Sequence, residues 1–390
     1  MWGCQLRQAL CSVHHQLKKS FGILPASTHW HHTVPTSPSC AWQLNDGHLE
    51  LKYRDTLMRF DYFWLRDHCR SPSCYNTKTN QRSLDTASVD LTIKPQAVRV
   101  DETTLFLTWR QESSLPIFEG LPQRGGGGQV IFQSTQRPDK ELWMETEQGE
   151  IQPGNKEEFS DRTTNPWNRS CLRKLWELHH WKETIYGRMW YFTSDFSRGD
   201  TAYTKLALDR HTDTTYFQEP CGIQVFHCLR HEGTGGRTLL VDGFYAAEQV
   251  LQRAPEDFDL LTKVPLRHEY IENMGSCRNH MIGVGPVLNI YPWNKELYLI
   301  RYNNYDRAVI NTVPHETVHR WYIAHRTLTT ELRRPENELW VKLKPGKALF
   351  VDNWRVLHGR ESFTGYRQLC GCYLTRDDVL NTARFLGLQA

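Results

Sequence analysis

The 390-residue sequence lacks several features that define common classes of protein. Its formal net charge is only +3 and no basic run outside the N-terminus resembles a phosphate-binding surface, so nucleic acid is not an expected partner. No apolar run approaches the roughly 18 residues that a spanning helix needs, which excludes a membrane span. The 11 cysteines are odd in number and scattered, which favours a reducing compartment over a disulfide framework.

Acidic residues are absent from the first 45 positions. Arg7, Lys18 and Lys19 stand there among apolar residues spaced three or four apart, as in a basic amphipathic helix. This combination is typical of a mitochondrial presequence, the alternative being a disordered acid-poor tail. We expect residues 1–40 to be a presequence and tail, and the mature protein to lie in the mitochondrial matrix.

Alternating apolar and polar residues predict strands in two parts of the chain. Residues 41–110 read as a small β-rich domain and residues 181–390 as a larger domain with many strands and few helices, typical of an antiparallel sandwich or barrel. The expected strands lie at 48–53, 59–65, 88–93, 103–109, 221–229, 237–244, 285–293, 296–304, 338–353 and 367–375, and the expected helices at 243–253 and 316–332.

Residues 111–180 have a different character. They contain the run "QRGGGGQ" from Gln123 to Gln129, clustered Pro, Glu, Lys and Arg, and no sustained period of two or 3.6. By composition we expect an atypical insert of low order between the two domains.

The segment "LDRHTDTTYF" suggests half of a metal site. With 18 His and 44 acidic residues among 390, chance gives about two His-x-Asp/Glu pairs, and two are present, so the pair alone proves nothing. On a strand, residues i and i+2 share one face, so His211 and Asp213 could reach one ion while Thr212 turns away. "FVDNWRVLHGRESF" offers a third ligand, His358, at the end of an apolar strand and before the turn-forming Gly359.

Two imidazoles and one carboxylate suit two metals. They form the facial triad of non-haem Fe(II) oxygenases, which leaves three coordination positions open. Zinc would accept the same ligands with a water in the fourth place. Spacing cannot separate the metals, and structural histidines are the plain alternative.

Longer motifs carry a specific resemblance. "RHTDTTYFQEPCGIQVFHCLRHEGTGGRTLLVDGF" and "LFVDNWRVLHGRESFTGYRQLCGCY" resemble the Fe(II)/2-oxoglutarate oxygenases of the taurine-dioxygenase and γ-butyrobetaine-dioxygenase type. The resemblance covers residues 40–109 and 182–390. It implies a double-stranded β-helix (jelly-roll) core preceded by a small β-rich domain, with Fe(II) as cofactor, 2-oxoglutarate and O₂ as co-substrates, ascorbate as reductant and a homodimer as the assembly.

Site residues follow from the same resemblance. His211, Asp213 and His358 match the iron ligands. Arg367 matches the arginine that grips the distal carboxylate of 2-oxoglutarate, for which a planar fork is suited, and Thr238 stands where relatives place a hydroxyl for that carboxylate. From residues alone, a surface ion pair and a solvent-facing strand residue are the plain alternatives for these last two.

The implied substrate is N6,N6,N6-trimethyllysine, hydroxylated at C3 in the first step of carnitine biosynthesis. Its quaternary amine cannot donate a hydrogen bond and is best held by aromatic faces. The resemblance places Tyr186, Trp190 and Tyr203 on an aromatic cage and Asn303 on a substrate contact. Asp200 replaces an asparagine of the butyrobetaine enzyme. Core packing is the plain alternative for the aromatic residues.

Two departures from the family pattern matter. Relatives hold a zinc ion with three cysteines and a histidine, whereas here only Cys69 and Cys74 remain, Ser71 takes the middle place and the histidine is missing, so zinc is not expected. The segment 111–180 matches no expected regular structure. Two alternatives therefore stand beside the hydroxylase: a catalytically impaired variant of it, and a γ-butyrobetaine hydroxylase.

Overall fold

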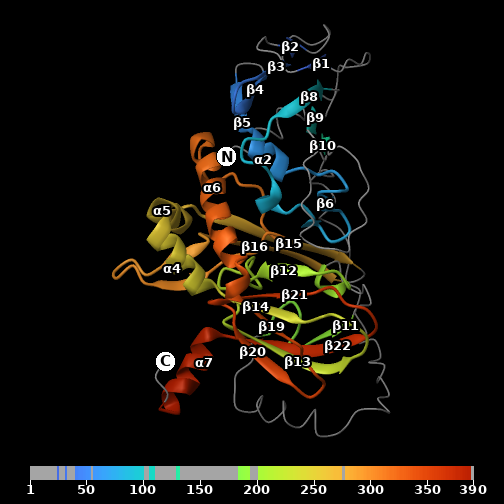
Figure 1. Ribbon diagram of the computed structural model, residues 1–390, viewed down its shortest axis with the longest axis vertical. Helices are drawn as coiled ribbons and strands as arrows, with labels where there is room; N and C mark the ends of the chain where they lie inside the picture. Colours follow the sequence, from blue (N-terminus) through green and yellow to red (C-terminus); the bar gives the residue numbers. More distant parts are fainter. Residues whose placement is uncertain are drawn as a thin grey trace, which may run out of the picture.

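The computed structural model describes residues 24–25, 31–32, 40–53, 56–100, 105–109, 129–131, 183–193, 201–274 and 277–387. Most of the predicted presequence, most of the predicted insert and Asp200 lie outside these residues. The described chain is mainly β with a few helices, as expected (Figure 1). No helix within these ranges combines the length and apolarity that crossing a membrane requires.

Two four-stranded antiparallel sheets form the larger domain. They bring together strands that are far apart in the sequence, which is the arrangement of a jelly roll and confirms the expected fold class. The first sheet has the order β11 (Trp190–Thr193), β22 (Arg367–Leu374), β13 (Ile223–His231), β20 (Ala348–Asp352), and the second β12 (Leu208–His211), β21 (Val356–Arg360), β14 (Thr238–Asp242), β19 (Glu338–Val341).

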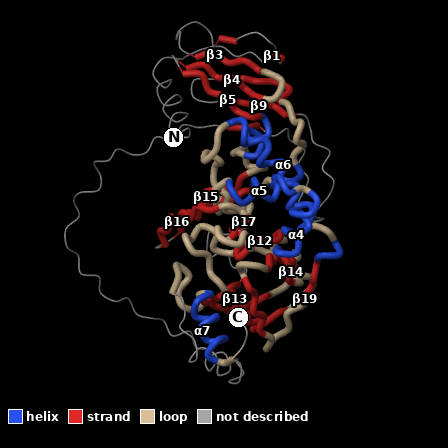
Figure 2. The backbone as a smooth tube through the Cα atoms, turned by 90° about the vertical axis from the view of Figure 1, so that its left-hand side faces the viewer, coloured by secondary structure: helices blue, strands red, loops and turns tan. Residues whose placement is uncertain are grey.

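The N-terminal part forms two further small sheets, drawn at one end of the molecule in Figures 1 and 2. A short helix, α2 (Tyr62–Asp67), and the hairpin of β6 (Tyr75–Asn76) and β7 (Gln81–Arg82) connect them to the larger domain. The small sheets contain β2 (His31–His32), β3 (Cys40–Leu44), β4 (His48–Tyr53), β5 (Thr56–Asp61), and β1 (Leu24–Pro25), β8 (Pro95–Val100), β9 (Leu105–Trp109), β10 (Gln129–Ile131).

Helices α4 (Gly243–Arg253), α5 (Pro255–Lys263) and α6 (His315–Leu332) pack together beside the second sheet (Figure 2). The predicted helices are confirmed as α4 (Gly243–Arg253) and α6 (His315–Leu332). Asp242 begins α4 by accepting hydrogen bonds from the amides of Phe244 and Tyr245, as an N-cap aspartate does. The sequence reading missed α5 (Pro255–Lys263) and α7 (Arg376–Phe385).

Several strand predictions were wrong or incomplete. The segment 59–65 is a strand only to Asp61, because the Asp61 carboxylate accepts from the amide of Trp64 and starts α2. The segment 88–93 forms turns after the 3₁₀ helix η2 (Thr86–Ser88). Gly359 forms no turn: it lies inside β21, where a Cβ atom would come within 2.7 Å of the carbonyl oxygen of Leu208 on β12.

The longest missed element is the hairpin of β15 (Leu266–Met274) and β16 (Cys277–Gly285). Its inward positions on β15 alternate regularly, but two of them, His268 and Glu272, are polar although buried. Polar residues at inward positions hide the apolar alternation on which strand prediction depends. A second short hairpin pairs β17 (Leu288–Ile290) with β18 (Leu297–Ile300).

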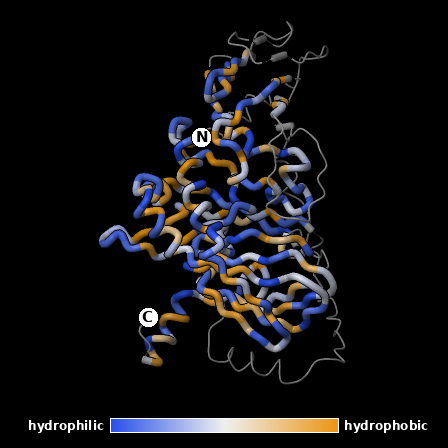
Figure 3. Tube along the Cα trace, viewed as in Figure 1, coloured by the Kyte–Doolittle hydropathy of each residue, from blue (hydrophilic) through white to orange (hydrophobic). Residues whose placement is uncertain are grey.

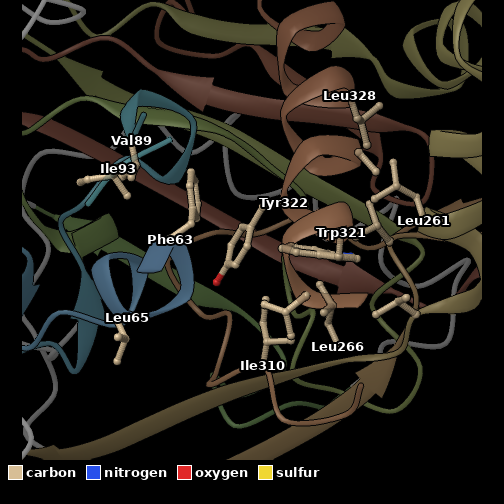
Figure 4. Close-up of a cluster of buried hydrophobic side chains, with 14 of the residues drawn as sticks. Phe63, Leu65, Val89, Ile93, Leu261, Leu266, Ile310, Trp321, Tyr322 and Leu328 are labelled. Atoms are coloured by element: carbon tan, nitrogen blue, oxygen red, sulfur yellow. The ribbon is translucent and has the colours of Figure 1, made fainter. Parts of the chain in front are cut away.

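A continuous hydrophobic core joins the N-terminal part to the larger domain (Figure 4). The ring of Phe63 on α2 lies 4.3 Å, between centroids, from the ring of Tyr322 on α6. A second cluster, which includes Trp190, Phe192 and Leu369, lines the space between the two large sheets. Figure 3 shows apolar and polar residues alternating through these sheets, as expected for strands with one inward face.

An ion cluster is buried in the same junction. The carboxylate of Asp67 is fully buried, pairs with the guanidinium of Arg307 at 3.0 Å and accepts from the hydroxyls of Thr86 and Tyr322 at 2.7 Å. Arg82 completes the cluster by donating to the carbonyl oxygens of Asp67 and Arg307. Because these residues come from both parts of the chain, the cluster fixes the N-terminal part against the sheets that carry the cavity.

Candidate metal and substrate site

The three predicted metal ligands meet at one point. Strands β12 and β21 pair so that His211 and His358 are direct partners, with ring centroids 4.6 Å apart. Asp213 lies two residues beyond the end of β12, and its Oδ1 lies 3.2 Å from Nε2 of His211 and 3.7 Å from Nε2 of His358. One ligand atom from each of the three lies within 4.8 Å of the others. Thr212 turns away and hydrogen-bonds the backbone of Tyr302.

Neighbouring groups orient these ligands. Nδ1 of His211 lies 2.7 Å from the carbonyl oxygen of Asp209, so this nitrogen carries the proton and Nε2 is left with a lone pair for a metal. The second carboxylate oxygen of Asp213, Oδ2, accepts hydrogen bonds from the amide of Gln224 and from the phenol of Tyr373. Such outer contacts fix the direction of a ligand and are a regular part of metal sites.

The protonation states of Asp213 and His358 also suit a metal. Burial lowers the pKa of His211, but the hydrogen bond and the charge of Asp213 outweigh burial and raise it, so a metal ion bound there would displace a proton. Burial favours the neutral form of Asp213, but His358 and His211 outweigh it and hold the pKa of the carboxyl well below its usual range. Burial lowers the pKa of His358 to about 4, against the attraction of Asp213. A carboxylate and a neutral imidazole are the forms that bind a divalent cation.

The donor set fits a ferrous ion. Two imidazole nitrogens and one carboxylate oxygen converge from one side, which leaves room on the other side for further ligands. The remaining space is a cavity of about 130 Å³ between the two sheets. Zinc accepts the same donors, so the choice of iron rests on the rest of the cavity and on the family.

The predicted co-substrate residues both line this cavity. Arg367 begins β22 and is only 3 % exposed, and its Nε has no hydrogen-bond partner among the described residues. Burial lowers the pKa of its guanidinium to about 10. A buried guanidinium in this state suits a carboxylate that arrives with a ligand. Thr238 begins β14 and is also buried, so neither residue is the solvent-facing group of the plain alternative.

Aromatic residues form another part of the wall. Tyr186, Trp190 and Tyr203, all predicted as cage residues, line the cavity. The rings of Tyr186 and Trp190 lie 6.2 Å and 6.1 Å from the ring of Tyr373. Tyr203 packs against Phe192 at 5.1 Å. Ring faces around a cavity suit a quaternary ammonium group.

The predicted substrate contact Asn303 also lines the cavity, but its amide is engaged. Its Nδ2 donates to Asp306 at 2.8 Å, and its Oδ1 accepts from the backbone amide of Tyr305 at 2.9 Å. Asn303 therefore contributes to this wall partly by holding Asp306 and Tyr305 in place, in addition to offering its own polar atoms to a ligand. Asp200, the other predicted contact, lies outside the described residues.

Sequence reading missed several residues that line the site, among them Tyr373, Gln224, Gln81, Arg360 and Asp306. A signal was available for Tyr373, because residues at even steps from Arg367 along β22 share its face. Gly371 lies between them on that face, and a Cβ there would meet the indole of Trp190 at 2.3 Å. The glycine leaves the space that this ring fills.

Arg360 and Gln81 act on the loop that carries Tyr203. Arg360 is buried and donates to the carbonyl oxygens of Ala202, Thr204 and Leu206 at 2.7–3.0 Å. No local sequence pattern predicts these contacts, because the donor and its acceptors are more than 150 residues apart in the sequence.

The cysteine pair of the N-terminal part is buried at the end of α2. Cys69 donates to the hydroxyl of Ser71 at 3.2 Å, and Arg66 donates to the sulfur of Cys74 at 3.2 Å. A hydrogen bond from Cys69 lowers the pKa of the Cys74 thiol to about 5. The absence of zinc from this place remains a prediction.

Comparison with known proteins gives the family. The model described as taurine catabolism dioxygenase TauD, TfdA family matches residues 171–373, and that of the gamma-butyrobetaine hydroxylase-like N-terminal region matches 41–119. A crystal structure of PvcB from Pseudomonas aeruginosa is similar at 17 % identity over 54 % of this chain and 71 % of that one, with a TM-score of 0.38, too low to carry an argument.

Curated relatives are much more similar in sequence than PvcB is. The chain is 65 % identical over 425 residues to trimethyllysine dioxygenase, mitochondrial, of Gallus gallus, with all of both chains covered. It is 68 % identical over 388 residues to the protein of that name in Homo sapiens, covering 94 % of this chain and 92 % of that one. Gamma-butyrobetaine dioxygenase of Pongo abelii is 25 % identical over 360 residues. The chain therefore belongs to the TauD/TfdA dioxygenase family and, within it, to the trimethyllysine dioxygenases.

Proposed function

We propose that the chain hydroxylates N6,N6,N6-trimethyllysine at C3 with 2-oxoglutarate and O₂, the first step of carnitine biosynthesis, in the mitochondrial matrix. One observation carries this proposal: a single cavity is lined by the His211, Asp213 and His358 trio, the buried guanidinium of Arg367 and a set of aromatic rings. The names and high identity of the curated relatives support it.

His211, Asp213 and His358 would hold a ferrous ion, which supplies the oxidising chemistry when 2-oxoglutarate and O₂ are bound. Arg367 and Thr238 would bind the distal carboxylate of 2-oxoglutarate and fix its position in the cavity. In the overall reaction, one oxygen atom of O₂ becomes the hydroxyl on C3 and the other enters succinate, while 2-oxoglutarate loses CO₂. Ascorbate would keep the metal in its ferrous form.

The rings of Tyr186, Trp190 and Tyr203 would enclose the trimethylammonium group, with Asp200 and Asn303 at the rest of the ligand. Holding this group fixes the distance from the quaternary nitrogen to C3 along three further carbons, so the anchored end decides which carbon meets the metal. Orientation of this kind supplies a large share of catalysis in such sites. The buried walls of the cavity exclude water from the reacting groups.

The test is an assay of the purified protein with Fe(II), 2-oxoglutarate, ascorbate and trimethyllysine. Succinate formation that depends on trimethyllysine supports the proposal, as does a 3-hydroxylated product. Activity with γ-butyrobetaine in place of trimethyllysine would instead support the sibling reaction. We also propose a homodimer, which the family resemblance implies, and sedimentation of the same preparation would test it.

A second candidate is a family member that binds iron but does not turn over. The observation behind it is that the two matched family ranges, 41–119 and 171–373, leave residues 120–170 between them, within the predicted insert. A soluble protein that binds Fe(II) and 2-oxoglutarate, yet forms no succinate with either amine, would support this reading.

A further inference from the structure

The cavity contains a carboxylate that the proposed reaction does not yet use. Among the described residues that line it, the acids are Asp213, which faces the histidines, and Asp306. Asp306 is 6 % exposed and lies in the turn after β18. Its Oδ2 accepts from the amide of Asn303 at 2.8 Å, and its Oδ1 from the amide of Gln81 at 3.0 Å.

Gln81 brings the N-terminal part of the chain into the site. It lies on β7, is 5 % exposed and lines the same cavity. While its Nε2 donates to Asp306, its Oε1 accepts from both the backbone amide and the hydroxyl of Thr201 at 2.8 Å. One side chain thus fixes the carboxylate of Asp306 and the first residue of η4 (Thr201–Tyr203), the turn that carries Tyr203.

Asp306 lies on the metal side of the cavity. The Nδ2 of Asn303, which donates to Asp306 at 2.8 Å, also lies 3.5 Å from the carbonyl oxygen of Thr212, the residue between His211 and Asp213. The ring of Tyr305, beside Asp306 in the chain, lies 5.9 Å from the ring of His211.

The shape of the substrate places its α-ammonium near the metal. The carbon to be hydroxylated, C3, is bonded directly to the α-carbon, so the α-ammonium is two bonds from the reacting position and far along the chain from the trimethylammonium group. A ligand whose C3 faces the metal position and whose quaternary nitrogen lies among the rings therefore carries its primary ammonium close to the metal position, in the part of the cavity that Asp306 also lines. Unlike the quaternary nitrogen, that group can donate hydrogen bonds to a carboxylate.

We propose that Asp306, oriented by Gln81, binds the α-ammonium of the substrate and selects an amino acid over a betaine that lacks this group. This inference rests on the proposed function. Asp306 acts as a specificity-determining residue and Gln81 as a positioning residue, so the N-terminal part of the chain contributes to substrate choice.

The test compares two ligands on two proteins. Trimethyllysine and its analogue with hydrogen in place of the α-ammonium are titrated calorimetrically, without O₂, into the full chain loaded with Fe(II) and 2-oxoglutarate. The same titrations are made with Asp306→Asn, which keeps the shape and removes the charge. Losing one partner of a buried charge pair should weaken trimethyllysine binding by about 30-fold or more, while affinity for the analogue changes by less than about threefold.

The ratio of the affinity for trimethyllysine to the affinity for the analogue measures the preference for an α-ammonium, and this preference is compared between the two proteins. Loss of the wild-type preference for trimethyllysine in Asp306→Asn supports the inference, and an unchanged preference overturns it, whatever the absolute affinities. Loss of the preference in Asp200→Asn with its retention in Asp306→Asn also overturns it. If Asp306→Asn does not fold, Gln81→Leu is tested: a smaller preference supports the inference and an unchanged one overturns it. Wild-type protein that binds no trimethyllysine would overturn the proposed function, and this inference with it.

Discussion

The phenol of Tyr373 donates a 2.9 Å hydrogen bond to Oδ2 of Asp213, whose other oxygen faces the two histidines. The same tyrosine lies beside the rings of Tyr186 and Trp190. Tyr373 therefore connects Asp213, a proposed metal ligand, to the aromatic rings that would bind the substrate.

Tyr373→Phe should weaken the metal site, because Asp213 keeps only the amide of Gln224 on Oδ2. Loss of such an outer contact typically lowers metal affinity or activity by about 10- to 100-fold. Anaerobic titration with Fe(II) measures the affinity, and succinate formation the activity. The matched control is Tyr366→Phe, since Tyr366 does not line the cavity. Equal Fe(II) affinity and activity in the two variants would contradict the role of this hydrogen bond.

Arg367→Lys should raise the KM for 2-oxoglutarate by about tenfold or more, since a lysine ammonium cannot reproduce the bidentate fork. The KM for trimethyllysine should change little, because the substrate binds elsewhere in the cavity. Initial rates at varied concentrations of each compound separate the two effects. Arg230→Lys, an exposed change on β13, serves as the control. A rise confined to the KM for trimethyllysine would show that Arg367 binds the other ligand.

The sequence predicted the elements in which local pattern and tertiary structure agree. The bounds of α4 and most strands of the two sheets follow from periodicity, and in the structure Asp242 caps α4 where the predicted helix begins. Periodicity did not predict β15, because polar residues occupy buried positions there. It also predicted a strand for the apolar run after Asp61, where the chain instead forms α2.

The site was predictable where a motif is contiguous and not where it is assembled by the fold. The spacing of His211 and Asp213 suggested half of a metal site and an apolar strand offered His358, but the family resemblance was needed to select this trio and to supply Arg367. Gln81 could not be found, because its role depends on contacts to Thr201 and Asp306, 120 and 225 residues away. Only the packing of the two parts of the chain brings these groups together.

Asp67→Asn should destabilise the folded chain by about 3–5 kcal/mol, the usual cost of removing one partner from a buried ion pair. The guanidinium groups of Arg82 and Arg307 would remain buried without a carboxylate between them. Denaturant unfolding measures this loss, with the exposed change Asp259→Asn as control. A cost below about 1 kcal/mol, the level of a surface pair, would show that the cluster does not hold the junction together.

Stability should fall as the pH falls from about 6.5 towards 3. Burial lowers the pKa of His68 and of His325 to about 3, so the unfolded chain takes up these protons first and unfolding is favoured in that window. The Asp67 carboxyl, whose pKa is also lowered, adds to the loss below about pH 4.

His325→Gln tests one of these groups. Between pH 6.5 and 5 each buried neutral histidine accounts for up to ~2 kcal/mol of the loss, so the variant should lose correspondingly less stability over that interval. Urea unfolding at both pH values measures it, and His280→Gln, at an exposed position, should behave as wild type. The same pH dependence in all three proteins would refute the assignment.

The central claim is that two imidazoles and one carboxylate bind a single ferrous ion, although His358 follows Asp213 by 145 positions in the sequence. Its most direct test is the stoichiometry of Fe(II) bound under argon by the wild type and by the double variant His211→Ala, His358→Ala. We predict one ion per chain in the wild type and none in the variant, with both chains folded. Retention of one tightly bound Fe(II) by the variant would contradict the account.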